Sequence, residues 1–232
     1  MFHLRLRRGI FIQNKLKIIA LLPMKNNSER VPNKNFKLLN NRPLYKWVLD
    51  SLLMVERIDK IIINTDAEKK FQKLKNNPKI VIKKRKDKIC GDFVSMNEII
   101  KDDLNDFNAD IFIMTHTTNP FLSSETINEC LDKFLESTND SLFTVNKLQT
   151  RFYDKGAKPI NHSVTKLLRT QDLDPYFEEN SCLYIFTSKS FNKTNNRIGE
   201  FPLMYEMKKK EALDIDDSED WELAEIFANE KK

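Results

Sequence analysis

The sequence predicts a doubly wound α/β fold with a mostly parallel sheet, and three observations support that prediction. Short apolar runs of strand length, rich in β-branched residues, alternate with segments in which apolar residues recur at helical spacing. Strands that alternate with helices in this way favour a parallel sheet with right-handed crossovers. The chain has 232 residues, which is enough for one α/β domain with a substantial core.

The first elements follow from the local pattern. "KIIALLP" at 17–23 is typical of a buried strand that ends at a proline, and "PLYKWVLDSLLMV" at 43–55 places Pro43 in the first turn of an amphipathic helix. Ser123 or Ser124 can cap a further helix at 123–137. The remaining elements of this part are strands at 60–66, 79–84, 109–116 and 141–148, and helices at 67–76 and 93–107.

The alternation breaks after residue 147. Residues 147–180 are polar, mix proline with charge and show no clear period, which predicts an excursion that serves as a subunit contact or a lid. Strands return at 181–188 and 201–207, and 212–230 is expected to hold a strand end, a tight turn and a terminal helix. We therefore expect a single domain at 16–232, preceded by a poorly ordered N-terminal extension at 1–15.

Composition argues against several classes of protein. The net charge of +5 arises from interspersed basic and acidic residues without an aromatic-basic stripe, so nucleic acid is not an expected partner. The three cysteines lie far apart, which indicates reduced thiols in a cytoplasmic protein. No run is long enough for a membrane span. With 4 glycines and neither GxxxxGK[ST] nor GxGxxG, the chain lacks the common phosphate loops.

The loop after the first strand carries three cations, Lys25, Arg30 and Lys34, within ten residues. In doubly wound sheets, ligands bind beyond the carboxyl ends of the strands, where this loop begins. Cations placed there can neutralise the charge that develops on a leaving pyrophosphate. The alternative is a solvated loop, and the local sequence leaves both interpretations open.

Two carboxylates near the carboxyl terminus form a second candidate group. In "ALDIDD", Asp214 and Asp216 are two residues apart, so an extended segment points both to the same face. Mg²⁺ normally takes one or two protein carboxylates together with phosphate oxygens. Helix capping is the competing interpretation, and it accounts for Asp217 or Ser218 but leaves the pair unexplained.

Other polar residues at predicted strand ends have two interpretations each. Asp66 can bind a sugar, a base or a metal, or it can cap the next helix. Arg85 can reach a phosphate or base, or it can belong to a solvated basic run. His116 can be a general base, although a lone histidine at a strand end more often makes a structural hydrogen bond. No Ser-His-Asp grouping can be identified around Ser28 or Ser95.

Taken in order, these segments resemble the acylneuraminate cytidylyltransferase family, the CMP-sialic acid synthetases and their relatives, over residues 16–229. The family's opening loop, (A/P)-x-(R/K)-x-x-S-x-x-(I/V/L)-P-x-K-N, appears here as "PMKNNSERVPNKN". Its "STD" appears as "NTD", its "QPTSP" as "HTTNP", and its closing metal pair as "DID". The resemblance implies a Rossmann-like nucleotidyltransferase fold.

The resemblance also implies roles for individual residues. It makes Lys25, Lys34 and Asp216 catalytic, and it makes Asp214 and Asp216 the metal ligands. The implied nucleotide-binding residues are Lys25, Asn27, Ser28, Lys34, Asn35, Arg85 and Ser95. The implied sugar-binding residues are His116, Asn119, Arg169, Gln171 and Asn180.

The implied reaction uses CTP and Mg²⁺. The anomeric hydroxyl of an acidic keto sugar attacks the α-phosphate, which yields a CMP-sugar and pyrophosphate. A homodimer, in which residues 147–180 complete the partner's sugar pocket, is implied as well. A family arginine falls on Leu122 and a glutamine on His116, so sugar recognition is expected to differ while the nucleotide end is retained.

The acceptor stays open among sialic-acid-like nonulosonic acids, with the eight-carbon Kdo as an alternative. Two other functions also stay open. One is a different nucleotidyltransferase or a nucleotide-sugar glycosyltransferase on a related sheet. The other is a non-catalytic relative that binds CTP without turnover.

Overall fold

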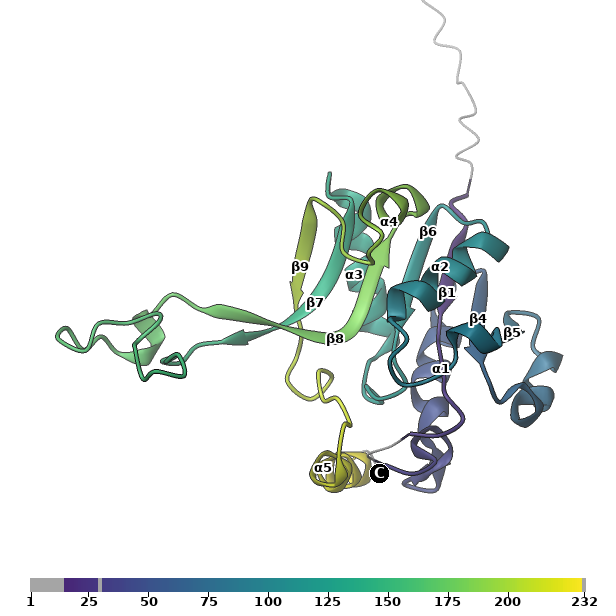
Figure 1. Cartoon of the computed structure of the whole chain (residues 1–232), viewed down its shortest axis with the longest axis horizontal. Helices are drawn as coiled ribbons and strands as arrows, with labels where there is room; N and C mark the ends of the chain where they lie inside the picture. Colours follow the sequence, from purple (N-terminus) through teal and green to yellow (C-terminus); the bar gives the residue numbers. More distant parts are fainter. Residues whose placement is uncertain (1–14, 29–30, 231–232) are drawn as a thin grey trace, which may run out of the picture.

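A seven-stranded sheet runs through the computed structural model, which describes residues 15–28 and 31–230 of the chain (Figure 1). Its strand order is β5-β4-β1-β6-β8-β7-β9. Six strands point the same way, and β8 runs antiparallel between β6 and β7. The bounds are β1 Ile18–Leu21, β4 Lys60–Thr65, β5 Ile80–Lys84, β6 Ile111–Thr115, β7 Ser141–Leu148, β8 Tyr176–Phe186 and β9 Pro202–Glu206.

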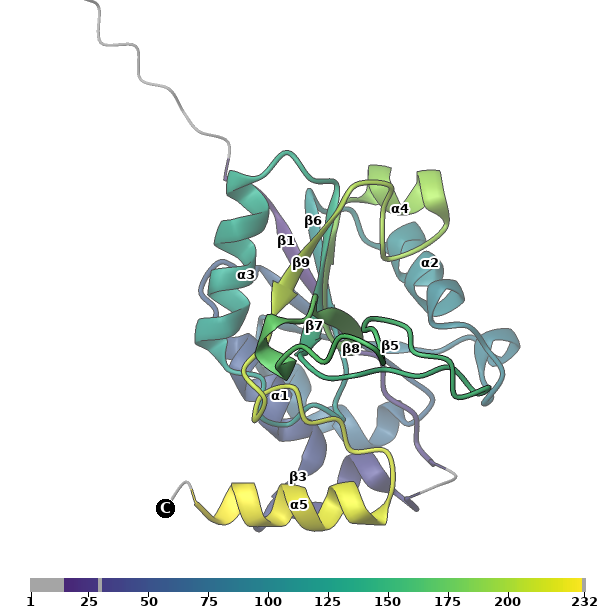
Figure 2. The same ribbon diagram turned by 90° about the vertical axis from the view of Figure 1, so that its left-hand side faces the viewer.

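Helices cover both faces of this sheet (Figure 2). α1 and α3 lie on one face, and α2 and α4 lie on the other. Side chains of one strand alternate between the two layers, so Ile61 of β4 joins the core under α1 and Ile62 joins the core under α2. The predicted doubly wound architecture is confirmed. The helices are α1 Leu44–Met54, α2 Met96–Asp106, α3 Ser124–Glu136 and α4 Ser188–Thr194.

The crossover through α3 differs in hand from the crossover through α1. α1 leads from β1 toward the β5 edge of the sheet, whereas α3 leads from β6 toward the β9 edge. Both helices pack on the same face and share one core cluster, so the two connections turn in opposite senses. The expectation that every crossover is right-handed is therefore wrong. The buried stripe of α3 joins the core of α1 rather than that of α2.

The carboxyl ends of the parallel strands are where the polar loops begin. Met24 extends β1 through an isolated bridge to Thr65, the last residue of β4. The carboxylate of Asp66 accepts the backbone N–H of Asn26 at 2.6 Å. The following helix, Glu68–Asn76, is 3₁₀ in character and has no side-chain cap, so the capping interpretation of Asp66 is wrong. Asp66 instead fixes the start of the opening loop.

β7 and β8 continue beyond the sheet as a long hairpin arm that projects from the molecule (Figure 1). The strands still pair at Leu148 and Tyr176, so the irregular part of the expected excursion is 149–175. Apolar side chains on the arm face solvent, with Val164 60% and Leu167 78% exposed. This surface buries little within the chain itself.

The C-terminal helix α5, Ser218–Asn229, lies beside the carboxyl ends of the strands (Figure 2). The carboxylate of Asp217 caps it by accepting two backbone N–H groups at 2.9 and 3.1 Å. Trp221 is buried with Val31 and Leu39, which belong to the segment after β1. α5 thus ties the C-terminal segment to the opening region.

Some expected features differ or lie outside the described residues. The helix α4 was not expected from the sequence, which shows no clear helical pattern there. Most of the expected N-terminal extension, residues 1–14, is outside the described part, and Lys15 pairs with Asp59 at 3.1 Å. Across residues 15–28 and 31–230, no helix has the length and apolar character that crossing a bilayer requires.

Candidate functional site

The opening loop and the C-terminal segment meet at the carboxyl edge of the sheet. The ammonium group of Lys34 donates to the carbonyl of Ile215 at 2.5 Å and lies 3.7 Å from Oδ1 of Asp216. Lys34 is 8% exposed, whereas the Asp216 side chain is half-exposed. The structure therefore brings together two charged groups, Lys34 and Asp216, that are 182 residues apart in the sequence.

Backbone and amide contacts hold this junction. Asn35 donates through Nδ2 to the carbonyl of Lys25 at 2.7 Å and accepts from the hydroxyl of Thr117 at 2.5 Å. The Ile215 N–H donates to the carbonyl of Thr118 at 2.8 Å. Three segments that follow or flank different strands are thus fixed relative to one another, so the charged side chains are positioned before any ligand arrives.

The aspartate pair fits a hard divalent cation. Burial raises the pKa of Asp214, the charge of Asp216 adds to this, and Thr118 and Lys34 act in the opposite direction. Oδ1 of Asp214 is buried and has no hydrogen-bond partner among the described residues. Mg²⁺ takes one or two carboxylates and completes its shell with water and phosphate oxygens. The described residues contain no cluster of three or more His, Cys, Asp or Glu side chains for a metal, so such further ligands would be needed.

Asp214 also lines a cavity of about 590 Å³ at the base of the arm. The cavity lies between the end of β9, the segment before α5 and residues 146–150 of the arm. Eight of its twelve lining residues are polar or charged, including Asn146, Lys147 and Asp220. The site therefore opens toward the arm.

The remaining residues of the opening loop are more exposed. Lys25 pairs with Asp92 through an Nζ–Oδ1 contact of 2.8 Å, and both side chains are partly exposed. Asn27 is exposed and Ser28 is half-buried at the start of the loop. Arg30, the third cation expected there, lies outside the described residues.

Arg85 and Ser95 have structural contacts that the sequence does not reveal. The guanidinium of Arg85 is 2% exposed and donates to Oδ1 and the carbonyl of Asn64 at 2.9 and 2.8 Å. Ser95 caps α2 by accepting the N–H of Asn97 at 3.3 Å. Arg85 thus lies under the loop and supports it. Contact of either residue with a nucleotide stays a prediction.

Asn119 and Asn180 are built into the framework. Asn119 is fully buried and donates to the carbonyl of Leu213 at 3.3 Å. Oδ1 of Asn180 accepts the hydroxyl of Thr144 at 2.6 Å and the N–H of Cys182 at 3.2 Å. These amides fix the loop before α3 and the start of the inner half of β8. Their contact with a sugar stays a prediction.

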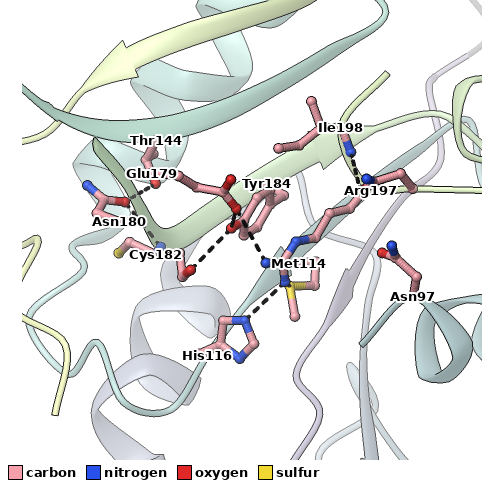
Figure 3. A network of polar contacts seen from close by, with 12 residues as sticks. Asn97, Met114, His116, Thr144, Glu179, Asn180, Cys182, Tyr184, Arg197 and Ile198 are labelled. Atoms are coloured by element: carbon pink, nitrogen blue, oxygen red, sulfur yellow. Dashed lines mark hydrogen bonds and ion pairs between the residues drawn. The ribbon is translucent and has the colours of Figure 1, made fainter. Parts of the chain in front are cut away.

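His116 belongs to a polar network on the α2 face of the sheet (Figure 3). Nη1 of Arg197 lies 3.3 Å from Nε2 of His116, and Nη2 of Arg197 lies 3.5 Å from Oε1 of Glu179. Burial first, and then the charges of Arg197 and Lys34, lower the pKa of His116 to about 3. Because a guanidinium can only donate, Nε2 accepts and Nδ1 carries the proton. His116 is thus a neutral ring that accepts from Arg197, and not a general base.

Sequence reasoning missed Arg197. It stands alone in a polar stretch between α4 and β9, 81 residues from His116, and no motif surrounds it. Leu122, where the resemblance places an arginine, is 1% exposed and packs in the apolar core. The cation beside the "HTTNP" loop therefore comes from a different element.

Arg169 and Gln171 lie on the arm and not at the carboxyl edge of the sheet. They belong to the short 3₁₀ turn of the arm, Thr170–Asp172, and its preceding residue. Arg169 is exposed and pairs with Asp172 at 2.7 Å. Figure 1 shows the arm projecting away from the carboxyl edge of its own sheet. The carbonyl of Thr170, which lies between them, accepts from Nε2 of Gln149, a residue that lines the same cavity as Asp214, and contact of Arg169 or Gln171 with a sugar stays a prediction.

Solved structures resemble this chain in fold. A structure of CMP:2-keto-3-deoxy-manno-octonic acid synthetase complexed with CTP has a TM-score of 0.68 at 12% identity and covers 93% of this chain and all of that one. A 4-diphosphocytidyl-2C-methyl-D-erythritol synthase from Anaerococcus prevotii has a TM-score of 0.66 at 13% identity, with the same coverage. At these identities the likeness shows the shared fold.

Sequence comparison adds curated relatives. The chain is 26% identical to the N-acylneuraminate cytidylyltransferase of Escherichia coli O18:K1:H7, over 94% of this chain and 53% of that protein. It is 21% identical to the pseudaminic acid cytidylyltransferase of Campylobacter jejuni, over 91% of this chain and 96% of that protein. The chain spans about half the length of the N-acylneuraminate enzymes it matches. The cytidylyltransferase family profile matches residues 19–231, and the chain therefore belongs to the cytidylyltransferase family.

Proposed function

We propose that this chain transfers CMP from CTP to the anomeric hydroxyl of an acidic nonulosonic sugar and releases pyrophosphate. The observation that carries the proposal is the junction of Lys34 with Asp216 at the carboxyl edge of the sheet. Membership of the family and the names of the curated relatives support the reaction class. The two relatives named above act on different nonulosonic acids, so the acceptor within that class is left to experiment.

In the proposed mechanism, cations of the opening loop hold the triphosphate. Lys34 is nearly buried, so its charge is poorly screened and acts strongly on a nearby phosphate. Lys25 leaves Asp92 and binds the outer phosphates. Mg²⁺ bound by Asp214 and Asp216 would neutralise phosphate charge and polarise the phosphoryl group. The protein supplies positioning and electrostatic stabilisation, which are the main needs of phosphoryl transfer.

A homodimer is part of the proposal. The arm carries exposed apolar side chains, including Ile160, Val164 and Leu167, that bury little surface in the single chain. It also holds Arg169 and Gln171 away from their own sheet. Docking the arm onto a second copy would bury the apolar surface and bring polar side chains to the partner's sugar pocket.

Nucleotide and sugar selectivity test the proposed function. The protein is incubated with Mg²⁺, one nucleoside triphosphate and one sugar, and pyrophosphate and product mass are measured. We expect turnover with CTP far above UTP, GTP or ATP, and only when an acidic keto sugar is present. The panel contains N-acetylneuraminic, pseudaminic and legionaminic acids, with the eight-carbon Kdo for the alternative acceptor class. Equal use of all four nucleotides, or CTP binding without any product, would overturn the proposal.

A further inference from the structure

Arg197, in the connection between α4 and β9, is a cation largely removed from solvent. Its side chain is 16% exposed, although it belongs to a loop and not to a core element. A buried guanidinium is costly unless hydrogen bonds and an opposite charge compensate for its lost hydration. If its partners compensate the charge fully, its role is structural. If they do not, an anionic ligand is expected to bind there.

The partners of Arg197 orient it well but compensate its charge poorly. Its Cζ stacks 3.8 Å from the ring centroid of Tyr184, which fixes the plane of the guanidinium (Figure 3). Nη1 donates to His116 at 3.3 Å and lies 3.7 Å from the thioether of Met114. The carboxylate contact, to Glu179, is long at 3.5 Å, and the same oxygen accepts the hydroxyl of Tyr184.

The guanidinium retains unused donor capacity. It has five N–H donors in a planar fork, and the contacts above use only Nη1 and Nη2. Within residues 15–28 and 31–230, its Nε–H has no hydrogen-bond acceptor. A rigid, partly neutralised guanidinium can donate two parallel hydrogen bonds to a second carboxylate.

The position of Arg197 matches the chemistry of the proposed acceptor. Arg197 contacts His116 directly, and the charge of Lys34 also acts on the His116 ring, so a cation of the proposed triphosphate site lies within electrostatic range of the same side chain. In an α-keto acid sugar, the carboxylate and the attacking hydroxyl are bonded to the same carbon. When that hydroxyl is in position to attack the α-phosphate, the carboxylate lies beside the phosphate site. Because both groups are negatively charged, the carboxylate needs a cation of its own.

We propose that the guanidinium of Arg197, stacked on Tyr184 and hydrogen-bonded to His116, binds the carboxylate of the acidic sugar. The inference rests on the proposed function and names the residue that selects an acid over a neutral sugar. His116 is a positioning residue in this arrangement, because it holds Nη1 in place and presents its Nδ1–H nearby. Glu179 remains at Nη2 and limits the movement of the fork.

The test compares Arg197→Gln with Lys193→Gln. Lys193 is a matched control because it lies four residues earlier, pairs with Glu200 and is 62% exposed, away from the network. Initial rates are measured with CTP and the acid sugar that the wild type uses best, and again with the methyl ester of that sugar. We expect Arg197→Gln to raise the KM for the acid about tenfold or more, as loss of a charge-assisted hydrogen bond predicts. The KM for CTP should change less than twofold, and Lys193→Gln should match the wild type.

The methyl ester separates carboxylate recognition from a structural role. The wild type should prefer the acid over the ester by about tenfold or more, and Arg197→Gln should lose that preference. Arg197→Lys should restore it in part, since it keeps the charge and loses the fork. Equal losses with acid and ester, or a parallel rise in the KM for CTP, would overturn the inference.

Two further outcomes keep the inference testable. If Arg197→Gln does not fold, the test uses Arg197→Lys and the wild-type preference for the acid sugar over its methyl ester. A wild type that turns over the acid and the ester equally well would overturn the role of Arg197. If the wild type turns over no acid sugar, the proposed function fails first. Turnover with an unchanged acid preference in Arg197→Gln overturns only the role of Arg197.

Discussion

The two halves of the candidate site are built in different ways. The proposed nucleotide half consists of the loop after β1 and the segment before α5, two short stretches of the chain that contact each other through Lys34 and Ile215. The proposed sugar half consists of single side chains from separate elements, namely His116, Glu179 and Arg197, together with an arm that projects away from it. A site made from continuous stretches of one chain needs little from a second molecule. A site made from isolated side chains can change its sugar specificity with few substitutions.

The largest expected effect tests whether the nucleotide half is the catalytic one. Asp216→Asn removes a carboxylate charge beside Lys34 and should lower kcat by about 10³-fold or more, because charge stabilisation dominates phosphoryl transfer. Asp132→Asn is the control, since Asp132 pairs with Arg57 on an exposed surface. Pyrophosphate release measures the rates, and thermal unfolding should shift little because Asp216 is half-exposed. A loss below tenfold would place catalysis elsewhere.

The arm provides the next test, because it should affect the sugar half alone. Leu167→Asp puts a charge into the exposed apolar surface and should shift the chain toward monomer. Acid-sugar turnover should fall about tenfold or more while CTP binding stays within twofold. Ile226→Asp is the control, since Ile226 is an equally apolar residue, 58% exposed on α5. Sedimentation and sugar KM are measured together. A monomeric variant with full sugar turnover would show that each chain completes its own site.

The sequence predicts the meeting of the opening loop and the C-terminal segment for a physical reason. Parallel strands bring their carboxyl ends to one edge, so residues that directly follow strands converge there whatever their separation in the chain. The loops that carry Lys34 and Asp216 begin after β1 and β9, so that rule brings both loops to this edge. Capping by Asp217 is equally local, since it depends on the first turn of the next helix.

The sugar half and two features of the fold depend on contacts that no local pattern encodes. Arg197 reaches His116 from 81 residues away and lies in a stretch without periodicity. The reversed hand of the α3 crossover depends on which core the buried stripe of α3 joins. The antiparallel direction of β8 follows from its hairpin with β7, whose turn is a long irregular arm. Such features require knowledge of tertiary packing.

The stability of the fold should depend on pH through His116. The pKa of this imidazole is lowered to about 3 in the folded chain, against about 6.5 when unfolded, so the unfolded state binds more protons between these values. Stability contributed by the neutral ring is therefore full above about pH 6.5 and is lost as pH falls toward 3. Between pH 7 and 5 the wild type should lose about 2 kcal/mol more than His116→Gln.

Chemical denaturation of both proteins at several pH values measures this difference. Carboxylates elsewhere titrate in both proteins, so only the difference between their curves reports on His116. Parallel curves for the two proteins would mean that the ring takes up a proton in the folded chain. His116 would then become a cation in the proposed sugar half, and its Nε2 could no longer accept a hydrogen bond from Arg197.

The smallest expected effect concerns the pairing of Lys25 with Asp92, where a carboxylate occupies the position that a phosphate would take. Asp92→Asn removes this competitor, so CTP should bind more tightly. Both side chains are more than a third exposed, and such ion pairs contribute at most about 1 kcal/mol, which limits the gain to about fivefold. Asp87→Asn, an exposed change in the same connection, is the control for general charge.

Titration calorimetry with CTP at low and high salt separates the possible results. A competitive ion pair predicts a gain at low salt that shrinks at high salt, because screening weakens exposed charge pairs. It also predicts an unchanged sugar KM, since Lys25 belongs to the nucleotide half. Weaker CTP binding in Asp92→Asn would mean that Asp92 positions Lys25 for the phosphate and does not compete with it. The exposed loop that carries Asp92 would then belong to the preformed nucleotide half.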